Sequence, residues 1–312
     1  MKRFHYRQFE DIEALCELKS QRRRSISVVI PTLNEAATIG SIITVVRERL
    51  VDCFPLVDEI VVIDSGSADD TCEQARRAGA MVYLAEEIAP EQGHVAGKGE
   101  NLWKSLFVTH GDISVFVDGD IRDFHEGFVA GLVGPLLEEE ELSYVKAFYR
   151  RPLHEGGLQL PEGGGRVSEI LVRPLFAMFY PSLVDFVQPL AGEYAVRRAL
   201  LEKLPFPRGY GVETSHLIDV LHQCGMESFA QCDMENRRHR NRDIAELGGM
   251  ANEILQVFMM RAERDGIMSF SQKWLSRHAG HAQFGGSESA AKNILELVER
   301  PPYYTLHHPP EA

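Results

Sequence analysis

Short apolar runs alternate with longer amphipathic stretches along the first half of the chain. The runs lie at 27–31, 59–64, 81–84 and 112–117. Buried strands of a parallel sheet appear in sequence as such continuous apolar runs, and the amphipathic stretches between them provide helical crossovers. The pattern therefore predicts an α/β fold, in which a mostly parallel, Rossmann-like sheet is flanked by helices.

Changes in composition divide the 312 residues into three parts. Residues 1–25 are polar and predict an N-terminal helical extension, whereas residues 26–136 carry the alternation of strands and helices. Residues 137–312 contain a glycine-rich stretch at 154–165, and beyond residue 190 the pattern is mainly helical. We expect a ligand-binding first part and a second part with a helical C-terminus.

Charge and hydropathy exclude several classes of function. The net charge of −13 argues against a nucleic-acid-binding protein. The N-terminus lacks the apolar run of a signal peptide, and no stretch approaches about 18 uninterrupted apolar residues, so we expect a cytoplasmic protein without a membrane partner. Neither a dinucleotide-binding G-x-G-x-x-G nor a P-loop motif occurs.

Two carboxylates, Asp118 and Asp120, directly follow the run at 112–117. In an open α/β sheet, ligands bind at the edge where the carboxyl ends of parallel strands meet. Two anions this close repel each other, so a cation or hydrogen-bond donors usually hold them in place. A solvated turn is the alternative interpretation. Polar residues at the ends of the runs at 27–31 and 59–64 favour a binding site instead.

Motifs along most of the chain resemble one family of glycosyltransferases. The sequences at 31–35, 64–67 and 118–120 resemble the nucleotide-sugar half of the retaining GT-A enzymes. The second half is similar to the glucosyl-3-phosphoglycerate synthases, with the mannosyl-3-phosphoglycerate synthases close behind, at 163–175, 188–194, 207–213, 237–242 and 299–302. The resemblance covers roughly residues 26–302 and implies a GT-A fold with a helical acceptor-binding part.

The resemblance implies transfer of an α-glucosyl unit from UDP-glucose to the 2-hydroxyl of 3-phospho-D-glycerate, giving glucosyl-3-phosphoglycerate and UDP. Two alternatives remain open: a mannosyl-3-phosphoglycerate synthase that uses GDP-mannose, and a catalytically inactive nucleotide-sugar-binding scaffold. Glucose and mannose differ by one epimeric hydroxyl, which the sequence does not resolve. The resemblance also implies Mg²⁺ or Mn²⁺, a product of the compatible-solute type and a homodimer.

The implied donor site lies at the strand ends of the first half. Its residues are Pro31, Thr32, Leu33, Asn34, Glu35, Ser65, Lys98, Asp118 and Gly119. Asp120 and His239 are the implied metal ligands, although a histidine in a basic run is often only solvated. A carboxylate with an imidazole suits Mg²⁺ or Mn²⁺, and such a cation offsets the charge on a departing diphosphate.

The implied acceptor site collects anion-binding groups from the second half. Arg166 follows three glycines and is predicted to open a helix, so backbone N–H groups, the helix dipole and the guanidinium can converge on an anion. The acceptor-binding residues implied by the resemblance are Gly165, Arg166, Ser168, Tyr210, Gly211, Val212, Arg237 and Asn241.

Glu213, Asp120 and Leu190 are the implied catalytic residues. Glu213 would orient the acceptor, and Asp120 would hold the cation. Retention by double displacement requires a carboxylate nucleophile beneath the sugar. The motif offers only the apolar Leu190 and Ala191 there. We therefore expect front-face attack in which the departing diphosphate deprotonates the acceptor hydroxyl, without a protein nucleophile.

Overall fold

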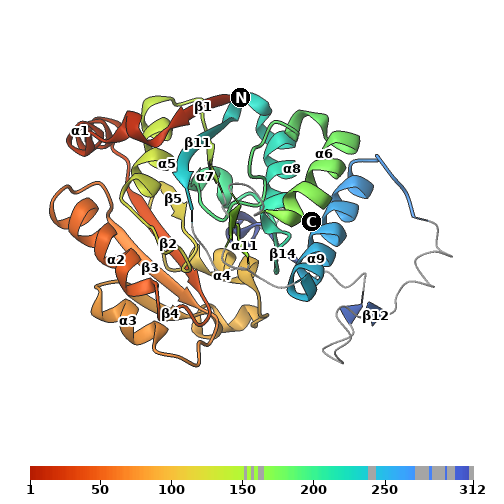
Figure 1. Ribbon diagram of the computed structural model, residues 1–312, viewed down its shortest axis with the longest axis horizontal. Helices are drawn as coiled ribbons and strands as arrows, with labels where there is room; N and C mark the ends of the chain where they lie inside the picture. The colour runs from red at the N-terminus through yellow and green to blue at the C-terminus, as the bar shows by residue number, and fades with distance from the viewer. Residues whose placement is uncertain are drawn as a thin grey trace.

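An eight-stranded sheet with helices on both faces forms the centre of the computed structural model (Figure 1). The structure describes residues 1–150, 153–155, 158–160, 165–237, 244–270, 281–282, 292–293 and 299–308. The strands, in spatial order, are β1 (Lys2–His5), β11 (Phe229–Asn236), β6 (Tyr144–Arg150), β9 (Tyr194–Arg197), β5 (Ile113–Phe116), β2 (Ile26–Thr32), β3 (Glu59–Asp64) and β4 (Met81–Leu84). The predicted α/β architecture with a mostly parallel sheet is confirmed.

Strand β9 runs antiparallel to both of its neighbours, β5 and β6, whereas the other pairs in this sheet are parallel. The expectation of a mainly helical chain beyond residue 190 is therefore wrong for β9 and β11. Gln231 interrupts the apolar pattern of β11, which hides the strand in the sequence. Its side chain is nevertheless buried and accepts a hydrogen bond from the backbone N–H of Val187 at 2.7 Å.

The sheet separates the helices into two layers, and an apolar core lies between each layer and the sheet. The helices are α1 (Ile12–Arg22), α2 (Ile39–Arg47), α3 (Thr71–Arg77), α4 (Lys98–Ser105), α5 (Gly127–Glu138), α6 (Arg173–Phe179), α7 (Arg198–Leu201), α8 (Val212–Cys224), α9 (Ile244–Arg264) and α11 (Tyr303–His307). Val28 and Ile30 of β2 face the core beneath α1, α2, α3 and α5, whereas Val29 faces the core of α4, α6, α8 and α9. This alternation is the period of two expected along a strand. Figure 1 shows α6, α8 and α9 side by side, away from α2 and α3.

The N-terminal segment, predicted as helical, also extends the sheet, because β1 pairs in parallel with β11. Near the other end of the chain, β14 (Glu299–Arg300) pairs with β10 (Phe206–Pro207). Two further hairpins join β7 (Leu153–Glu155) to β8 (Leu158–Leu160) and β12 (His281–Ala282) to β13 (Lys292–Asn293). Within the described residues, no helix is both long and apolar enough to cross a membrane.

Helix α4 packs unusually close to the chain that follows β10. A Cβ atom added to Gly99 would lie 1.8 Å from the carbonyl oxygen of Pro207. The backbone N–H of Glu100 donates to the carbonyl of Arg208 at 3.2 Å. Because only glycine permits this approach, the contact fixes where the first turn of α4, and with it Lys98, lies.

We predict that Gly99→Ala lowers the free energy of unfolding by about 1–3 kcal/mol, because the added methyl group overpacks the α4 contact. Gly249→Ala is the matched control. Gly249 also lies within a helix, but among the described residues no atom outside its own helical backbone lies within 4 Å of where an added Cβ atom would be. The control should raise stability by roughly 0.5–1 kcal/mol through helix propensity. Urea denaturation measures both, and equal effects would contradict the close packing of α4.

Candidate active site

A cavity of about 660 Å³ opens at the sheet edge where the parallel strands end. The residues that follow β2, β3, β5 and β11 reach it, and so do those that precede the antiparallel β9. It is lined by most of the predicted residues, namely Pro31, Thr32, Leu33, Glu35, Ser65, Lys98, Asp118, Gly119, Asp120, Gly165, Arg166, Ser168, Leu190, Tyr210, Glu213 and Arg237. The predicted donor and acceptor residues therefore share one cavity.

Three predicted binding residues do not line this cavity. Asn34 instead joins two loops: its amide oxygen accepts from Ala68 N at 2.8 Å, and its own N–H donates to Ser67 Oγ at 2.8 Å. Val212 is fully buried, and Gly211 contacts Val257, so both belong to the packing of α8 against α9. His239 and Asn241 lie outside the described residues.

Asp64, at the end of β3, organises the side of the cavity that carries the predicted donor-binding residues. Its buried carboxylate accepts hydrogen bonds from Thr32 Oγ1 at 2.8 Å, Gly66 N at 2.9 Å and Ser67 N at 2.7 Å. These bonds tie the ends of β2 and β3 together. Asn101, which sequence reasoning missed, adds a bond from its amide nitrogen to the carbonyl of Ile63 at 2.9 Å.

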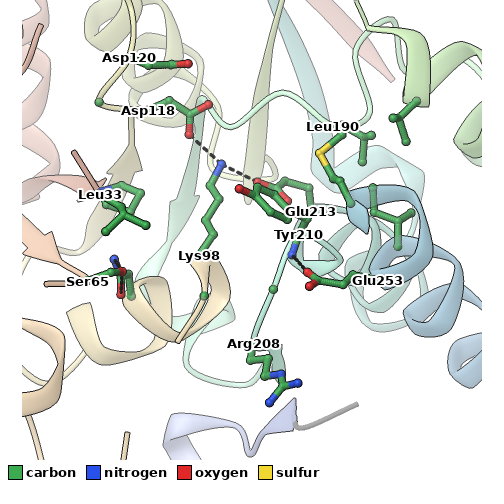
Figure 2. A pocket seen from close by; sticks show the side chains of 18 of the residues that line it. Leu33, Ser65, Lys98, Asp118, Asp120, Leu190, Arg208, Tyr210, Glu213 and Glu253 are labelled. Carbon is green, nitrogen blue, oxygen red and sulfur yellow. Dashed lines mark hydrogen bonds and ion pairs between the residues drawn. The ribbon is translucent and has the colours of Figure 1, made fainter. Parts of the chain in front are cut away.

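Lys98, the first residue of α4, bridges two carboxylates from different halves of the chain (Figure 2). Its Nζ lies 2.7 Å from Asp118 Oδ1 and 2.8 Å from Glu213 Oε1. Burial disfavours the charged lysine, but the two carboxylates outweigh this effect and raise the pKa of Lys98. Lys98 is therefore a stable cation at the centre of the cavity.

Arg237 provides a second cation on the other side of Asp118. Its Nη2 lies 2.8 Å from Asp120 Oδ1, 3.0 Å from Asp118 Oδ2 and 3.2 Å from Glu193 Oε1. Its Nη1 donates to the Tyr149 hydroxyl at 2.8 Å, and that hydroxyl donates to Glu193 Oε2 at 2.6 Å. Burial opposes ionisation of Asp118, but Lys98 and Arg237 hold the pKa of that carboxyl well below its usual range.

Sequence reasoning missed Glu193 and Tyr149, which hold Arg237 in this position. Both are buried, at 0% and 3% relative exposure. Glu193 lies in the motif at 188–194, next to apolar residues. A carboxylate in such a segment needs a partner when it is buried, and this was the only signal in the sequence. Nothing in the pattern of β6 distinguishes Tyr149 from an ordinary core tyrosine.

The predicted acceptor-binding residues begin where the helical turn at Arg166 leads into the π-helical segment Ser168–Val172 and then α6. Gly165, directly before this turn, has φ of +77°, a left-handed conformation that favours glycine. The hydroxyl of Ser168 is buried and has no hydrogen-bond partner among the described residues. A helix start with a buried, unpaired hydroxyl is suited to binding an anionic ligand.

Helix α9 closes the far wall, which sequence reasoning did not anticipate. Glu253 Oε2 accepts a hydrogen bond from the backbone N–H of Tyr210 at 3.0 Å (Figure 2). Leu247, Met250 and Ile254 add apolar surface to the same wall. Ile254, Val257 and Phe258 are buried, so this face of α9 belongs to the core.

The carboxylate of Asp120 fits a hard divalent cation. Its side chain is 26% exposed and lines the cavity, and oxygen donors of this kind suit Mg²⁺ or Mn²⁺. Within the described part of the chain, no three His, Cys, Asp or Glu side chains are arranged so that they could hold a metal ion by themselves. A cation here would therefore take ligands from a bound phosphate as well, as such ions commonly do.

Comparisons with known proteins agree with this geometry. Residues 27–192 match the family described as Glycosyl transferase family 2. Glucosyl-3-phosphoglycerate synthase from Petrotoga mobilis is 46% identical over 97% of this chain and 93% of its own. A crystal structure of glucosyl-3-phosphoglycerate synthase from Mycobacterium tuberculosis, in complex with Mn²⁺, UDP-glucose and phosphoglyceric acid, is 41% identical, covers 98% of this chain and 99% of its own, and has a TM-score of 0.84.

A crystal structure of mannosyl-3-phosphoglycerate synthase from Rubrobacter xylanophilus is also similar, with a TM-score of 0.87. It covers 98% of this chain and 97% of its own, at 35% identity. The fold and the cavity thus define a glycosyltransferase with the GT-A fold. The chain belongs to the glucosyl-3-phosphoglycerate synthase family.

We predict that Lys98→Met lowers the free energy of unfolding by about 2–3 kcal/mol, because Asp118 and Glu213 then lose their shared cation. Adding Glu213→Gln to this variant should recover part of the loss, since one of the two orphaned charges is removed. Lys203→Met, at an exposed lysine, is the control and should change little. Chemical denaturation of the wild type, Lys98→Met, Glu213→Gln and the double variant, read as a double-mutant cycle, measures the coupling. Strictly additive effects of the two site substitutions would contradict the bridge.

Proposed function

We propose that this chain transfers an α-glucosyl unit from UDP-glucose to the 2-hydroxyl of 3-phospho-D-glycerate, with Mg²⁺ or Mn²⁺. One observation carries the proposal: a single cavity joins Asp118, Asp120 and Lys98 to Arg166 and its anion-binding helix start. The first group suits a nucleotide diphosphate with a cation, and the second suits the phosphate or carboxylate of an acceptor. The related structure with UDP-glucose and phosphoglyceric acid supports both assignments.

We assign a separate role in the reaction to each charged residue of the cavity. Lys98 keeps its charge between Asp118 and Glu213, so it can meet the donor's phosphates. A divalent cation at Asp120 would offset the charge that develops on the departing diphosphate. Glu213 is 3% exposed and held by Lys98, which restricts its carboxylate to one orientation, suited to a hydroxyl of the acceptor or the sugar.

A protein nucleophile is not part of this proposal. Asp118 and Glu213 both pair with Lys98, and Asp120 pairs with Arg237. Leu190 presents only an apolar side chain to the cavity. We propose front-face attack by the acceptor hydroxyl, with its proton passing to the departing diphosphate. This route breaks the bond from the anomeric carbon to the diphosphate and forms the new glycosidic bond on the same face.

The glucosyl assignment is favoured over the mannosyl one. The Petrotoga glucosyl enzyme is 46% identical to this chain, and the Rubrobacter mannosyl enzyme is 35% identical. The intact acidic and basic side chains of the cavity disfavour an inactive scaffold. A homodimer and a cytoplasmic location are further parts of the proposal, and they rest on the family resemblance and on the sequence.

We predict that Asp120→Asn lowers kcat by roughly 10²-fold or more, because a ligand of the cation is lost while the side-chain shape is kept. The apparent affinity for Mn²⁺ should fall as well, which a titration of activity against the metal measures. Asp52→Asn is the control, since Asp52 is exposed, pairs with Arg47 and does not line the cavity. Unchanged turnover and unchanged metal dependence in Asp120→Asn would overturn the metal assignment.

Substitution of Arg166 distinguishes the acceptor side from the donor side. Arg166→Ala should raise the KM for 3-phosphoglycerate at least tenfold, because a charge-assisted contact to an anion contributes roughly 2–3 kcal/mol. UDP-glucose binding, measured by calorimetry, should hardly change. Arg77→Ala removes a surface arginine paired with Glu73 and serves as control. Weakened UDP-glucose binding with an unchanged acceptor KM would place Arg166 in the donor site instead.

A further inference from the structure

Lys146, in the middle of β6, is a buried lysine beside the candidate active site. Its relative exposure is 0%. The pleat of β6 directs Tyr144 and Lys146 toward the core of α8, whereas Val145 and Ala147 face the opposite core. Its Nζ donates a hydrogen bond of 2.8 Å to the backbone carbonyl of Ala191. No motif in the sequence marks this residue.

A lysine in this position is costly for the fold. No carboxylate among the described residues lies within 4.0 Å of its Nζ to form an ion pair. Two aromatic rings also lie near the charge, with Nζ 5.0 Å from the centre of Tyr194 and 5.9 Å from that of Tyr144. A buried cation without a paired anion usually destabilises a protein, so its presence calls for a functional reason.

The hydrogen bond to Ala191 provides that reason, because Ala191 belongs to the 188–193 strip that borders the cavity. The neighbouring Leu190 lines the cavity. On the other side, a Cβ atom on Gly192 would lie 2.3 Å from Asp118 Oδ1, so the backbone there touches the carboxylate. The strip also turns on itself, with Ala191 N donating to the carbonyl of Gln188 at 3.0 Å.

We propose that Lys146 is a positioning residue of the reaction: by holding the carbonyl of Ala191, it fixes Leu190 and Gly192 against the reacting sugar and Asp118. The inference rests on the proposed function. It assigns to Lys146 no contact with substrate. Its effect reaches the reaction through the backbone of the 188–193 strip. A shift of this strip would displace Leu190, whereas Asp118 stays held by Lys98 and Arg237.

Charged and titratable groups face Lys146 from several of the elements around it. Glu213 and His216 face it from α8, Lys98 from α4, Glu193 from the strip before β9, Tyr194 from β9, Asp118 from the segment after β5 and Tyr144 from its own strand. Burial lowers the pKa of Lys146 to about 8, and the three carboxylates only partly oppose this. Burial also lowers the pKa of His216 to about 3 and raises those of both tyrosines.

Lys146→Met tests the inference, because it preserves the shape of the side chain and removes its charge. We predict a melting temperature, without substrates, equal to or above that of the wild type, since a buried unpaired cation is lost. We predict at least a tenfold lower kcat with UDP affinity unchanged. A fall of the wild-type kcat/KM for UDP-glucose above about pH 8 should be absent from the variant.

Lys19→Met is the matched control. Lys19 is also a buried lysine that donates to a backbone carbonyl, that of Pro55 at 3.0 Å, but it has an ion-pair partner, Asp58 at 2.7 Å, and lies outside the cavity. Its substitution should lower the melting temperature and leave kcat unchanged. The two lysines are thus expected to respond in opposite ways.

The outcomes separate the inference from the proposed function. If the wild type transfers glucose and Lys146→Met has the same kcat, or loses stability and UDP binding together, the positioning role is overturned. An alkaline fall that persists in Lys146→Met would overturn it as well. If the wild type itself transfers no glucose to 3-phosphoglycerate, the proposed function fails, whatever the variants do.

Discussion

Repulsion among four carboxylates at one sheet edge is the constraint on which the rest of the site depends. Asp118, Asp120, Glu193 and Glu213 converge there, and Lys98 and Arg237 hold them together. Each cation reaches carboxylates from separate parts of the chain, so the ion pairs also fix α4, α8 and the segment after β11 relative to β5. Because both cations also face the cavity, the groups that hold the site together are the groups available to an anionic substrate.

The antiparallel strand β9 gives this arrangement its second half. Parallel strands bring only their carboxyl ends to the binding edge, so loops that precede strands normally lie at the opposite edge. Since β9 runs the other way, the 188–193 strip that precedes it enters the cavity between Asp118 and Lys146. Glu193, the last residue of the strip, then meets Arg237. One reversed strand thus connects the first half of the chain to the second at the cavity.

Local patterns were sufficient to predict the strands of the first half and the acids that follow them. The apolar runs of β2, β3 and β5 are buried on both faces, so hydropathy marks them clearly. Strand β11 was missed because Gln231 pairs with backbone groups inside the protein, which hydropathy does not reveal. Residues such as Tyr149, Lys146 and Glu253 act through contacts between distant segments, and no local spacing encodes such contacts. The motif resemblance correctly grouped the charged residues that line the cavity. It also included Asn34, whose side chain joins two loops, and Val212, which is buried in the packing of α8.

The central claim is that one cavity joins a UDP-glucose site to a 3-phosphoglycerate site. A donor-by-acceptor matrix tests this most directly, with UDP-glucose, GDP-glucose and GDP-mannose each combined with 3-phosphoglycerate or glycerate, in Mg²⁺ or Mn²⁺. Product formation and anomeric configuration are read by proton NMR. The account predicts an α-glucosyl product that requires UDP-glucose, the phosphorylated acceptor and a divalent cation. Preferred transfer of mannose from GDP-mannose, or equal use of glycerate, would contradict it.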